Sequence, residues 1–374
     1  MSSDPSVLIV GGGIIGTMHA VLASEAGYKV THLERDPKPL SASVRNFGLI
    51  WVSGRQVGPE LALALRAREL WEGIGSKADI GFRGNGSLTI ATNEAEHTVL
   101  KEAIAMEDSE SRGFELLNQN ETKKLEPLLA GKYIGALRCT KDGAVEPNLL
   151  LGGLREYLQK NSDYTWVPNF EVSEFAHSET GNHVFSKDGR KFSADLISIC
   201  VGAEHKGFLG DLLSEQPIRK VHLQMAATVP IAEKLGHSIA DGDSLRYYPA
   251  FKDLSLDQLP PQPEVAAKFK MQLLLAQRFD GSFTIGDTHE YDEPFTHEIY
   301  EEPYRHLLRV IEGIFGRPSQ IERRWSGVYS QTTGPEIYTR VELAPGAVVV
   351  TGGGGRGNTL SPAIAEETIN SWAK

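Results

Sequence analysis

Three glycines near the N-terminus, Gly11, Gly13 and Gly16, have the spacing of a dinucleotide-binding turn. In such a turn the first glycine permits the tight bend, the second lets the backbone approach a pyrophosphate, and the third lets a helix pack closely on a strand. The N-terminus of the following helix then faces the phosphate charge. An acid, Glu34, ends the next strand pattern, where a carboxylate hydrogen-bonds the ribose hydroxyls of adenosine. Together these four residues predict a nucleotide cofactor site.

A second glycine run lies at the other end of the chain, at 352–355, after the apolar stretch 347–350 and before a predicted helix. Backbone N–H groups of such a turn can meet a ligand. A simple NAD-binding domain has no use for this second turn, whereas a flavin ring carries negative charge once it is reduced, and a helix N-terminus stabilises that charge. The acid at Glu34 disfavours NADP, and the sequence has no second fingerprint. The two turns together favour FAD.

The residues around these turns alternate between strand and helix patterns. The apolar run 7–10, the helical pattern 14–26 and the strand pattern 28–33 make a βαβ unit of about thirty residues. We therefore expect a parallel sheet and an α/β fold class. Alternation, apolar runs and turn residues predict the other elements. Strands are expected at 87–91, 222–229, 244–251, 271–278 and 282–288, a β-meander at 165–201, and helices at 61–71, 94–112, 120–129, 147–160, 304–315 and 362–372.

The composition is that of a globular protein of 374 residues, 40% apolar and 23% charged, and the length suggests about two domains. With 38 Lys and Arg against 49 Asp and Glu, the net charge of −11 argues against nucleic acid as the main partner, because phosphate backbones require a basic surface. The two cysteines, Cys139 and Cys200, exclude a disulfide framework, and we expect no metal site. The sequence has no apolar run long enough to span a membrane and no signal-peptide pattern at 1–6, so we expect a cytoplasmic protein.

The order of several short motifs along the whole chain resembles one enzyme family, the FAD-dependent amine oxidoreductases of the D-amino-acid oxidase, glycine oxidase and sarcosine oxidase type. The motifs lie at 11–16 with 34–35, 41–48, 143–147, 195–203, 324–327 and 351–366. The resemblance implies a Rossmann-type FAD-binding domain, βαβ and discontinuous, and a second α+β substrate domain built on a mixed sheet. The expected ranges are 1–84, 145–217 and 320–374 for the first domain and 85–144 and 218–319 for the second. The stretch 45–48 with Trp51 looks like a subgroup associated with aminophosphonate breakdown.

The resemblance also implies that FAD is held noncovalently, because the covalent flavin of some relatives needs a cysteine in the C-terminal third, which this chain lacks. In the family, the segment like 43–48 runs along the flavin, the strand ending at 201–203 touches the cofactor and the last glycine loop holds the ring. The residues so expected to bind FAD are Gly11, Gly13, Ile14, Ile15, Gly16, Glu34, Arg35, Ser43, Arg45, Asn46, Phe47, Gly48, Val172, Val201, Gly202, Ala203, Gly353, Gly354, Arg356, Gly357, Asn358 and Thr359.

One departure from the family concerns the substrate. In glycine oxidase relatives, an arginine two residues after the glycine of a Trp-x-Gly motif clamps the substrate carboxylate, whereas here Trp325-Ser326-Gly327 leads to Tyr329. A tyrosine cannot make the bidentate pair. We therefore expect another basic group to hold a differently placed anion, and we assign no catalytic residue. The candidates for substrate contact are Arg45, Gln224, Arg246, Tyr248, His289, Tyr329 and Arg356.

These features predict an enzyme that oxidises the C–N bond of a small amine with an anionic group, and 2-aminoethylphosphonate or its N-methyl form is the favoured substrate. Oxygen or another acceptor would reoxidise the flavin. Three alternatives stay open: an oxidase of glycine, sarcosine or a D-amino acid, a flavin monooxygenase, and a non-catalytic FAD-binding subunit. Residues 286–289 superficially match a flavin hydroxylase signature, although their place in the chain is wrong for it. Asp287 and His289 remain candidates to face the flavin.

Overall fold

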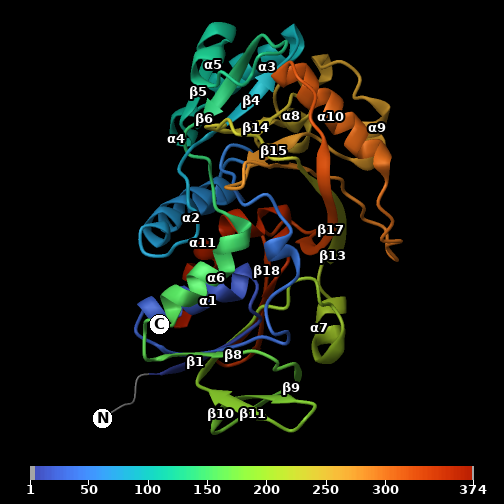
Figure 1. The fold of residues 1–374 in the computed structure, drawn as a ribbon. Coiled ribbons are helices and arrows are strands. Elements are labelled where there is room, and N and C mark those ends of the chain that lie inside the picture. The colour runs from blue at the N-terminus through green and yellow to red at the C-terminus, as the bar shows by residue number, and fades with distance from the viewer. Residues whose placement is uncertain (1–4, 373–374) are drawn as a thin grey trace.

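The computed structural model describes residues 5–372 and contains two large β-sheets, which lie toward opposite ends of the molecule in Figure 1. The first sheet has six strands in the order β18-β19-β12-β1-β2-β8. β1 (Ser6–Val10) lies between β12 (Leu196–Ile199) and β2 (Lys29–Leu33) and is parallel to both. The other strands are β8 (Tyr164–Val167), β19 (Ala347–Thr351) and the antiparallel edge strand β18 (Thr339–Ala344). This is the parallel sheet that the βαβ pattern predicts.

The central strand of this sheet is covered on both faces, as the continuous apolar run of β1 requires. Val7 and Ile9 belong to a core that contains residues of α1, α2, α6 and α11, whereas Leu8 packs with residues of a small antiparallel sheet and of α7. The predicted meander is thus divided between two sheets, because its first and last strands, β8 and β12, join the parallel sheet. The covering elements are α1 (Ile14–Glu25), α2 (Pro59–Gly75), α6 (Pro147–Leu158), α7 (Gly210–Ser214), α11 (Gly357–Trp372), β9 (Val172–Ser178), β10 (Gly181–Ser186) and β11 (Lys191–Ala194).

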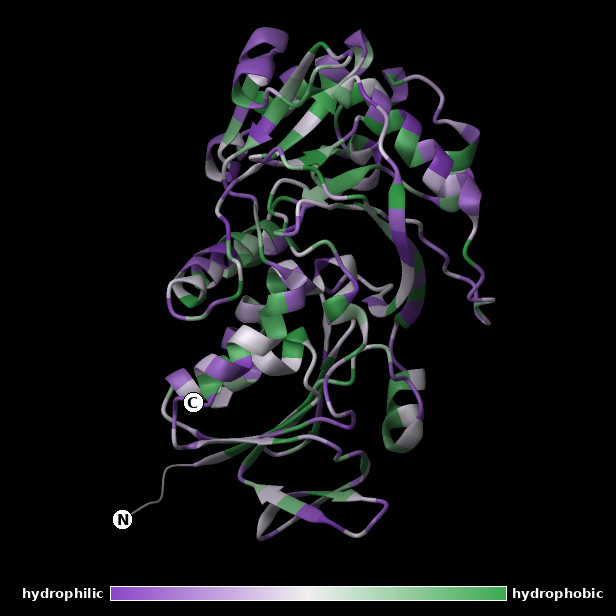
Figure 2. Cartoon of the chain, in the orientation of Figure 1, coloured by the Kyte–Doolittle hydropathy of each residue, from purple (hydrophilic) through white to green (hydrophobic). Residues whose placement is uncertain are grey.

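The second large sheet has eight strands in the order β17-β13-β16-β15-β14-β4-β6-β5 and is mixed, with β14 and β4 parallel. Figure 2 shows apolar residues along its strands and polar residues on the outer sides of its helices. The strands are β4 (Ser87–Ala91), β5 (Phe114–Asn118), β6 (Gly135–Cys139), β13 (Ile218–Thr228), β14 (Ser238–Ala240), β15 (Leu274–Gln277), β16 (Phe283–Gly286) and β17 (Ile321–Thr332). The helices of this part are α3 (Glu94–Ile104), α4 (Ser109–Arg112), α5 (Gln119–Leu125), α8 (Ser244–Tyr247), α9 (Glu264–Phe269) and α10 (Glu301–Phe315).

The structure corrects three sequence-based assignments in this second part. The predicted strand 244–251 is instead α8 followed by a short 3₁₀ turn, because Ser244 bonds back to Asp241 through its hydroxyl (2.6 Å to the carbonyl oxygen) and Pro249 offers no N–H to a sheet. The predicted helix 94–112 is broken into α3 and α4. Third, β17 pairs along its length with β13 and so belongs to the eight-stranded sheet, although the boundary at residue 320 put it with the first domain. We propose two domains built on the two large sheets, with β17 in the second.

A short two-stranded connection, with the buried Asp142 beside it, positions residues 49–53 relative to the eight-stranded sheet. β3 (Leu49–Ile50) pairs with β7 (Gly143–Ala144), and Asp142 just before β7 is fully buried. Its carboxylate accepts hydrogen bonds from the backbone N–H groups of Val52 (2.5 Å) and Ser53 (2.9 Å). It also accepts from the hydroxyls of Ser53 (2.7 Å) and Ser87 (2.6 Å), the latter on β4. One carboxylate therefore joins the loop after β3 to the eight-stranded sheet.

Candidate functional site

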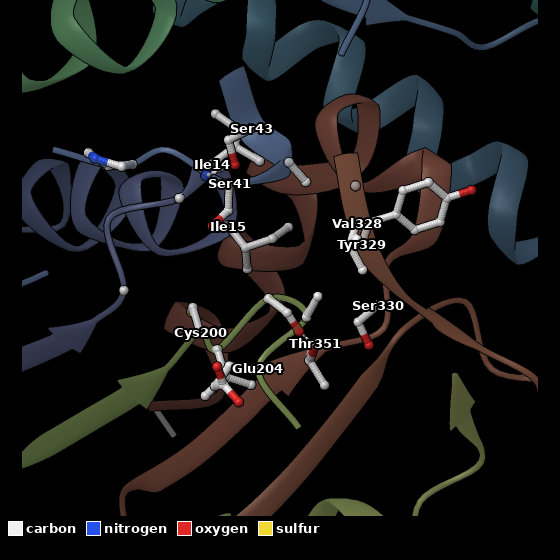
Figure 3. A pocket seen from close by; sticks show the side chains of 18 of the residues that line it. Ile14, Ile15, Ser41, Ser43, Cys200, Glu204, Val328, Tyr329, Ser330 and Thr351 are labelled. Atoms are coloured by element: carbon white, nitrogen blue, oxygen red, sulfur yellow. Dashed lines mark hydrogen bonds between the residues drawn. The ribbon is translucent and has the colours of Figure 1, made fainter. Parts of the chain in front are cut away.

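A cavity of about 950 Å³ lies between the carboxyl end of β1 and the edge strand β17. Figure 3 shows Ile15 and Ser43 of the N-terminal segments on one side and Val328 of β17 on the other. One end of the cavity is lined by Glu34 and the other by Tyr329. The cavity thus extends from the predicted adenosine site to the eight-stranded sheet, and its size suits a dinucleotide and a small substrate.

The first glycine turn has the backbone geometry that its sequence predicts. Gly11 has φ +107°, and a Cβ added there would lie 2.3 Å from the carbonyl oxygen of Cys200. A Cβ added at Gly16 would lie 1.9 Å from the carbonyl oxygen of Gly11, so neither position accepts a side chain without movement of the backbone. Gly13 is the N-cap residue that precedes α1, and it has no side chain that could bond to the first N–H groups of the helix. The N-terminus of α1 therefore meets the cavity with its positive end, where a pyrophosphate would lie.

Glu34 braces this turn. Its side chain is buried, and its Oε2 accepts a hydrogen bond from the Gly12 N–H (2.7 Å), while its Oε1 accepts from the Asp36 N–H (3.0 Å). Each carboxylate oxygen keeps a further lone pair, and Glu34 lines the cavity. The residue therefore fits the ribose-binding role. The neighbouring Arg35 also lines the cavity, but its guanidinium pairs with Glu204 at 3.2 Å.

The segment around Arg45 closes one side of the cavity against β17. The Arg45 side chain donates to the carbonyl oxygens of Leu40 (2.8 Å) and Ser326 (2.9 Å), and Trp325 donates its ring N–H to the Arg45 carbonyl oxygen (3.3 Å). Asn46 accepts from the Gly48 N–H at 2.7 Å. Arg45 therefore links the segment to β17 and lies at the cavity wall.

The second glycine run forms the opposite wall. Gly352 and Gly354 have φ of +75° and +62°, and the turn continues through a 3₁₀ segment (Gly354–Arg356) into α11. The carbonyl oxygen of Gly352 accepts from the N–H of Thr332 on β17 (2.9 Å). A Cβ added at Gly355 would lie 3.6 Å from the Tyr329 hydroxyl, so Tyr329 reaches across to this loop. The two chain ends thus converge on one small volume.

Most of the predicted cofactor residues come together around this cavity. Gly48, Arg356 and Thr359 are the three that do not line it. Gly48 has φ +78° and Thr359 is buried, with its hydroxyl accepting from the Trp51 N–H (2.9 Å), so both shape the wall from behind. The residues that do line it are Gly11, Gly13, Ile14, Ile15, Gly16, Glu34, Arg35, Ser43, Arg45, Asn46, Phe47, Val172, Val201, Gly202, Ala203, Gly353, Gly354, Gly357 and Asn358.

Arg356 is placed differently from the expectation that it serves the substrate. Its guanidinium lies 3.3 Å from a carboxylate oxygen of Glu60 and donates to the carbonyl oxygen of Ile337 (2.9 Å). The same Glu60 oxygen lies 3.6 Å from the guanidinium of Arg55, which is buried. Arg356 is therefore engaged in a charge cluster behind the glycine loop, which its position in the sequence does not reveal.

Of the seven predicted substrate residues, Arg45 and Tyr329 line the cavity. The amide oxygen of Gln224 accepts from the Tyr300 N–H (2.8 Å), and Tyr248 stacks on Trp51 with ring centres 6.0 Å apart. His289 is buried beside the cavity. Arg246 on α8 contacts Asp243 (3.3 Å) and the carbonyl oxygen of Pro260. Gln224 does not line the cavity, whereas its neighbours on β13, Leu223 and Met225, do.

Three further residues, Lys220, Leu223 and Met225, line the substrate side and were not assigned a role by sequence. Lys220 on β13 lines the cavity and pairs with Glu293 (3.2 Å), and Asp287 follows β16. Strand alternation could have indicated Leu223 and Met225, but it does not distinguish the two faces of β13. For Asp287 the only signal was the weak match at 286–289. Within residues 5–372 no group of three or more metal-ligating side chains is assembled, and no helix is long and apolar enough to cross a membrane.

Comparisons with known proteins identify the family and the fold of this chain. The family model described as "FAD dependent oxidoreductase" (DAO) matches residues 6–370. An opine oxidase subunit of Agrobacterium tumefaciens (strain Ach5) is 23% identical over 93% of this chain and 88% of its own length. The same-named protein of Rhizobium meliloti is 32% identical over 42% of this chain, and the match spans 46% of that relative.

Two solved structures share the fold along nearly the whole chain. Glycine oxidase from Geobacillus kaustophilus superposes with a TM-score of 0.76 at 19% identity, covering 99% of this chain and 94% of that one. L-α-glycerophosphate oxidase from Mycoplasma pneumoniae, a structure with FAD bound, superposes with a TM-score of 0.75 at 19% identity, covering 100% and 95%. The glycine turns, the acid at the second strand and the family match over 6–370 place this chain in the DAO family of FAD-dependent oxidoreductases.

Proposed function

We propose that this protein oxidises the C–N bond of a small amine that carries an anionic group, and that the amine is an aminophosphonate such as 2-aminoethylphosphonate or its N-methyl form. The observation that carries the proposal is Tyr329. Its hydroxyl would lie 3.6 Å from a Cβ added at Gly355 of the glycine loop, and Tyr329 stands in the sequence where the resemblance to glycine oxidase implies an arginine. Arg45 and Lys220, the latter paired with Glu293 at 3.2 Å, line the same cavity and are two cations that a differently placed anion would meet. A phosphonate is larger than a carboxylate and would need such a different clamp.

Bound FAD would supply the redox chemistry as the acceptor of two electrons from the C–N bond, and the glycine turns at 11–16 and 352–355 would hold it. The chain's own residues orient the amine and limit water. Phe47, Leu223 and Met225 give the substrate end an apolar wall, where electrostatic contacts are stronger than in bulk water. Oxygen or another acceptor would reoxidise the reduced FAD.

We propose a cytoplasmic location, because the two cysteines, Cys139 and Cys200, are not joined in a disulfide.

The relatives favour one second candidate. Two of them are named as subunits of an opine oxidase, so an N-substituted amino acid would be the substrate and the chain would act as one subunit of an assembly. The same cavity would then hold a carboxylate near Arg45 or Lys220. Glycine, sarcosine and D-amino acids remain the simpler members of this class, and a flavin monooxygenase or a non-catalytic FAD-binding subunit is tested by the same measurement.

Anaerobic reduction of the bound FAD separates these candidates. We expect 2-aminoethylphosphonate or N-methyl-2-aminoethylphosphonate to reduce the flavin faster than glycine or sarcosine does. Fastest reduction by glycine or sarcosine would refute the argument from Tyr329. Reduction by NADPH alone would instead support a monooxygenase, and reduction by none of these compounds would support the non-catalytic role.

Two substitutions at Tyr329 test whether this residue determines which substrate anion is bound. Tyr329→Arg should lower the glycine concentration for half-maximal flavin reduction at least about tenfold, because a guanidinium can pair with the carboxylate in a low-dielectric site. Tyr329→Phe removes only the hydroxyl and should not lower it. Equal responses of the two variants would show that residue 329 does not contact the substrate anion.

We also expect FAD to be released when the protein is denatured by acid. Cys139 is buried in β6, away from the cavity, and Cys200 lines the cavity beside Gly11, at the pyrophosphate end rather than at Tyr329. Burial raises the pKa of the Cys200 thiol to about 12, so it is not a nucleophile at neutral pH. Flavin absorbance that stays with the precipitated polypeptide would contradict this prediction, and Cys200→Ser would then identify the attachment point.

A further inference from the structure

Asp287 is an acidic residue at the substrate end of the cavity. It follows β16 and lines the cavity together with Leu223, Met225 and Tyr329. Its side chain keeps 14% of its surface exposed, so it is accessible from the cavity, while its Oδ1 atom is buried without a hydrogen-bond partner. A carboxylate oxygen left unpaired in a protein interior is costly, and such groups usually have a partner that binds there.

No lysine or arginine among the described residues pairs with this carboxylate. Among the described residues, no lysine or arginine nitrogen lies within 4.0 Å of Asp287, and the nearest basic atom is His289 Nε2, 3.7 Å from Oδ2. His289 Nδ1 must donate to the carbonyl oxygen of Lys270 (2.8 Å), because a carbonyl only accepts. His289 Nε2 lies 2.8 Å from the Tyr247 hydroxyl and can accept its proton. Both ring nitrogens of His289 thus have hydrogen-bond partners other than Asp287, so the imidazole makes no hydrogen bond to the Asp287 carboxylate.

The other groups around Asp287 are tyrosines. Four of them, Tyr247, Tyr248, Tyr291 and Tyr329, interact electrostatically with it. Burial raises the pKa of each of these four hydroxyls above its ordinary value, so they stay neutral over the range in which enzymes are assayed. Burial also raises the pKa of Asp287 itself, which makes its carboxylate a better proton acceptor than a carboxylate in water.

The geometry points to Asp287 as the group that binds the ammonium of the substrate and takes one of its protons. In this step an N–H bond of the ammonium breaks and an O–H bond forms on a carboxylate oxygen of Asp287, so the nitrogen is left with a free lone pair and no electrons are transferred. The amine must be neutral before hydride can leave the adjacent carbon. Arg45 and Lys220 elsewhere on the cavity wall remain for the anionic end. The inference rests on the proposed amine oxidation but not on the identity of the anion.

The first test compares Asp287→Asn with Asp292→Asn in the FAD-loaded protein. Asp292 is exposed in the same segment, so its variant controls for the lost charge. Binding is followed by the change in flavin absorbance at about 4 °C with amines and with analogues that lack nitrogen, such as ethylphosphonate and acetate. Asp287→Asn should weaken amine binding about 100-fold or more and leave the analogues unchanged. Asp292→Asn should change neither, and Asp287→Glu, which keeps the charge, should recover part of the amine affinity.

The second test is the pH dependence of flavin reduction. The defect of Asp287→Asn should shrink as the pH rises toward the pKa of the free amine, because the neutral amine then arrives from solution and needs no base. The groups that face Asp287 are His289, Tyr247, Tyr248, Tyr291 and Tyr329, and the four tyrosines stay protonated in this range. A residue with a purely structural role would give a defect that does not depend on pH.

The outcomes separate this inference from the proposed function. If aminophosphonates neither bind nor reduce the flavin but glycine or sarcosine does, the proposed substrate is wrong and Asp287 is tested with the active amine. If Asp287→Asn and Asp292→Asn bind that amine equally well, the inference about Asp287 is overturned whatever the substrate. It is also overturned if no amine binds to the wild-type protein. Should Asp287→Asn lose FAD, Asp287→Ser takes its place in both tests.

Discussion

Gly11→Ala should leave a protein that retains no FAD and is destabilised by at least about 3 kcal/mol. Two costs combine at this position. Gly11 has φ +107°, a region that L-residues rarely adopt, and the added Cβ would lie 2.3 Å from the carbonyl oxygen of Cys200. That oxygen belongs to the backbone directly after β12, so it cannot move aside without disturbing the sheet. The turn that presents the N-terminus of α1 would then be displaced from the pyrophosphate.

Gly27 provides the control that separates strain from collision. It also has positive φ, +86°, but a Cβ added there meets no atom within 4 Å. Gly27→Ala should therefore cost only about 1–2 kcal/mol and keep its FAD. The measurements are denaturant unfolding and the ratio of flavin to protein absorbance after purification. If Gly11→Ala binds FAD and unfolds at the same denaturant concentration as Gly27→Ala, then the close approach to Cys200 does not constrain the turn.

Asp142→Ala should lower the free energy of unfolding by about 3–5 kcal/mol and weaken FAD retention. Asp142 is fully buried and accepts four hydrogen bonds, two of them from the backbone of Val52 and Ser53. Alanine would leave these donors without a partner inside the protein. Because Trp51, next to Val52, bonds to Thr359 at the start of α11, the disturbance should reach the wall of the cofactor cavity.

Ser87→Ala is the matched control for this prediction. It removes only the hydroxyl of β4 that donates to Asp142, and it should cost about 1 kcal/mol while leaving FAD in place. The comparison uses denaturant unfolding of both variants with the flavin-to-protein ratio as the second readout. A loss from Asp142→Ala no larger than that from Ser87→Ala would mean that the carboxylate is not a structural link between the two sheets.

The sequence by itself determined the parts of this protein that depend on neighbouring residues. The βαβ unit follows from an apolar run, three glycines and an acid within about thirty residues, and each has a local backbone reason. Gly11 and Gly16 are required by steric contacts within the turn itself and with β12, and Glu34 accepts from the Gly12 N–H that it helps to place. Gly352 and Gly354, before α11, are likewise explained by the local backbone, because both have positive φ. Of the residues predicted to bind the cofactor, all but Gly48, Arg356 and Thr359 line the cavity.

Only the tertiary structure decided which charged and strand residues meet. β13 and β17 are about one hundred residues apart in the chain, and their pairing places Tyr329 at the substrate end. The charge of Arg356 is visible in the sequence, but its partner Glu60 is about three hundred residues away and is brought to it by folding. Asp287, by contrast, has no lysine or arginine within 4.0 Å among the described residues, and this can be seen only when every element packed around it is in place. The type of a side chain can be read from the sequence, whereas its electrostatic partner depends on packing between distant segments. The sequence therefore predicted a cofactor but did not predict which residues recognise the substrate.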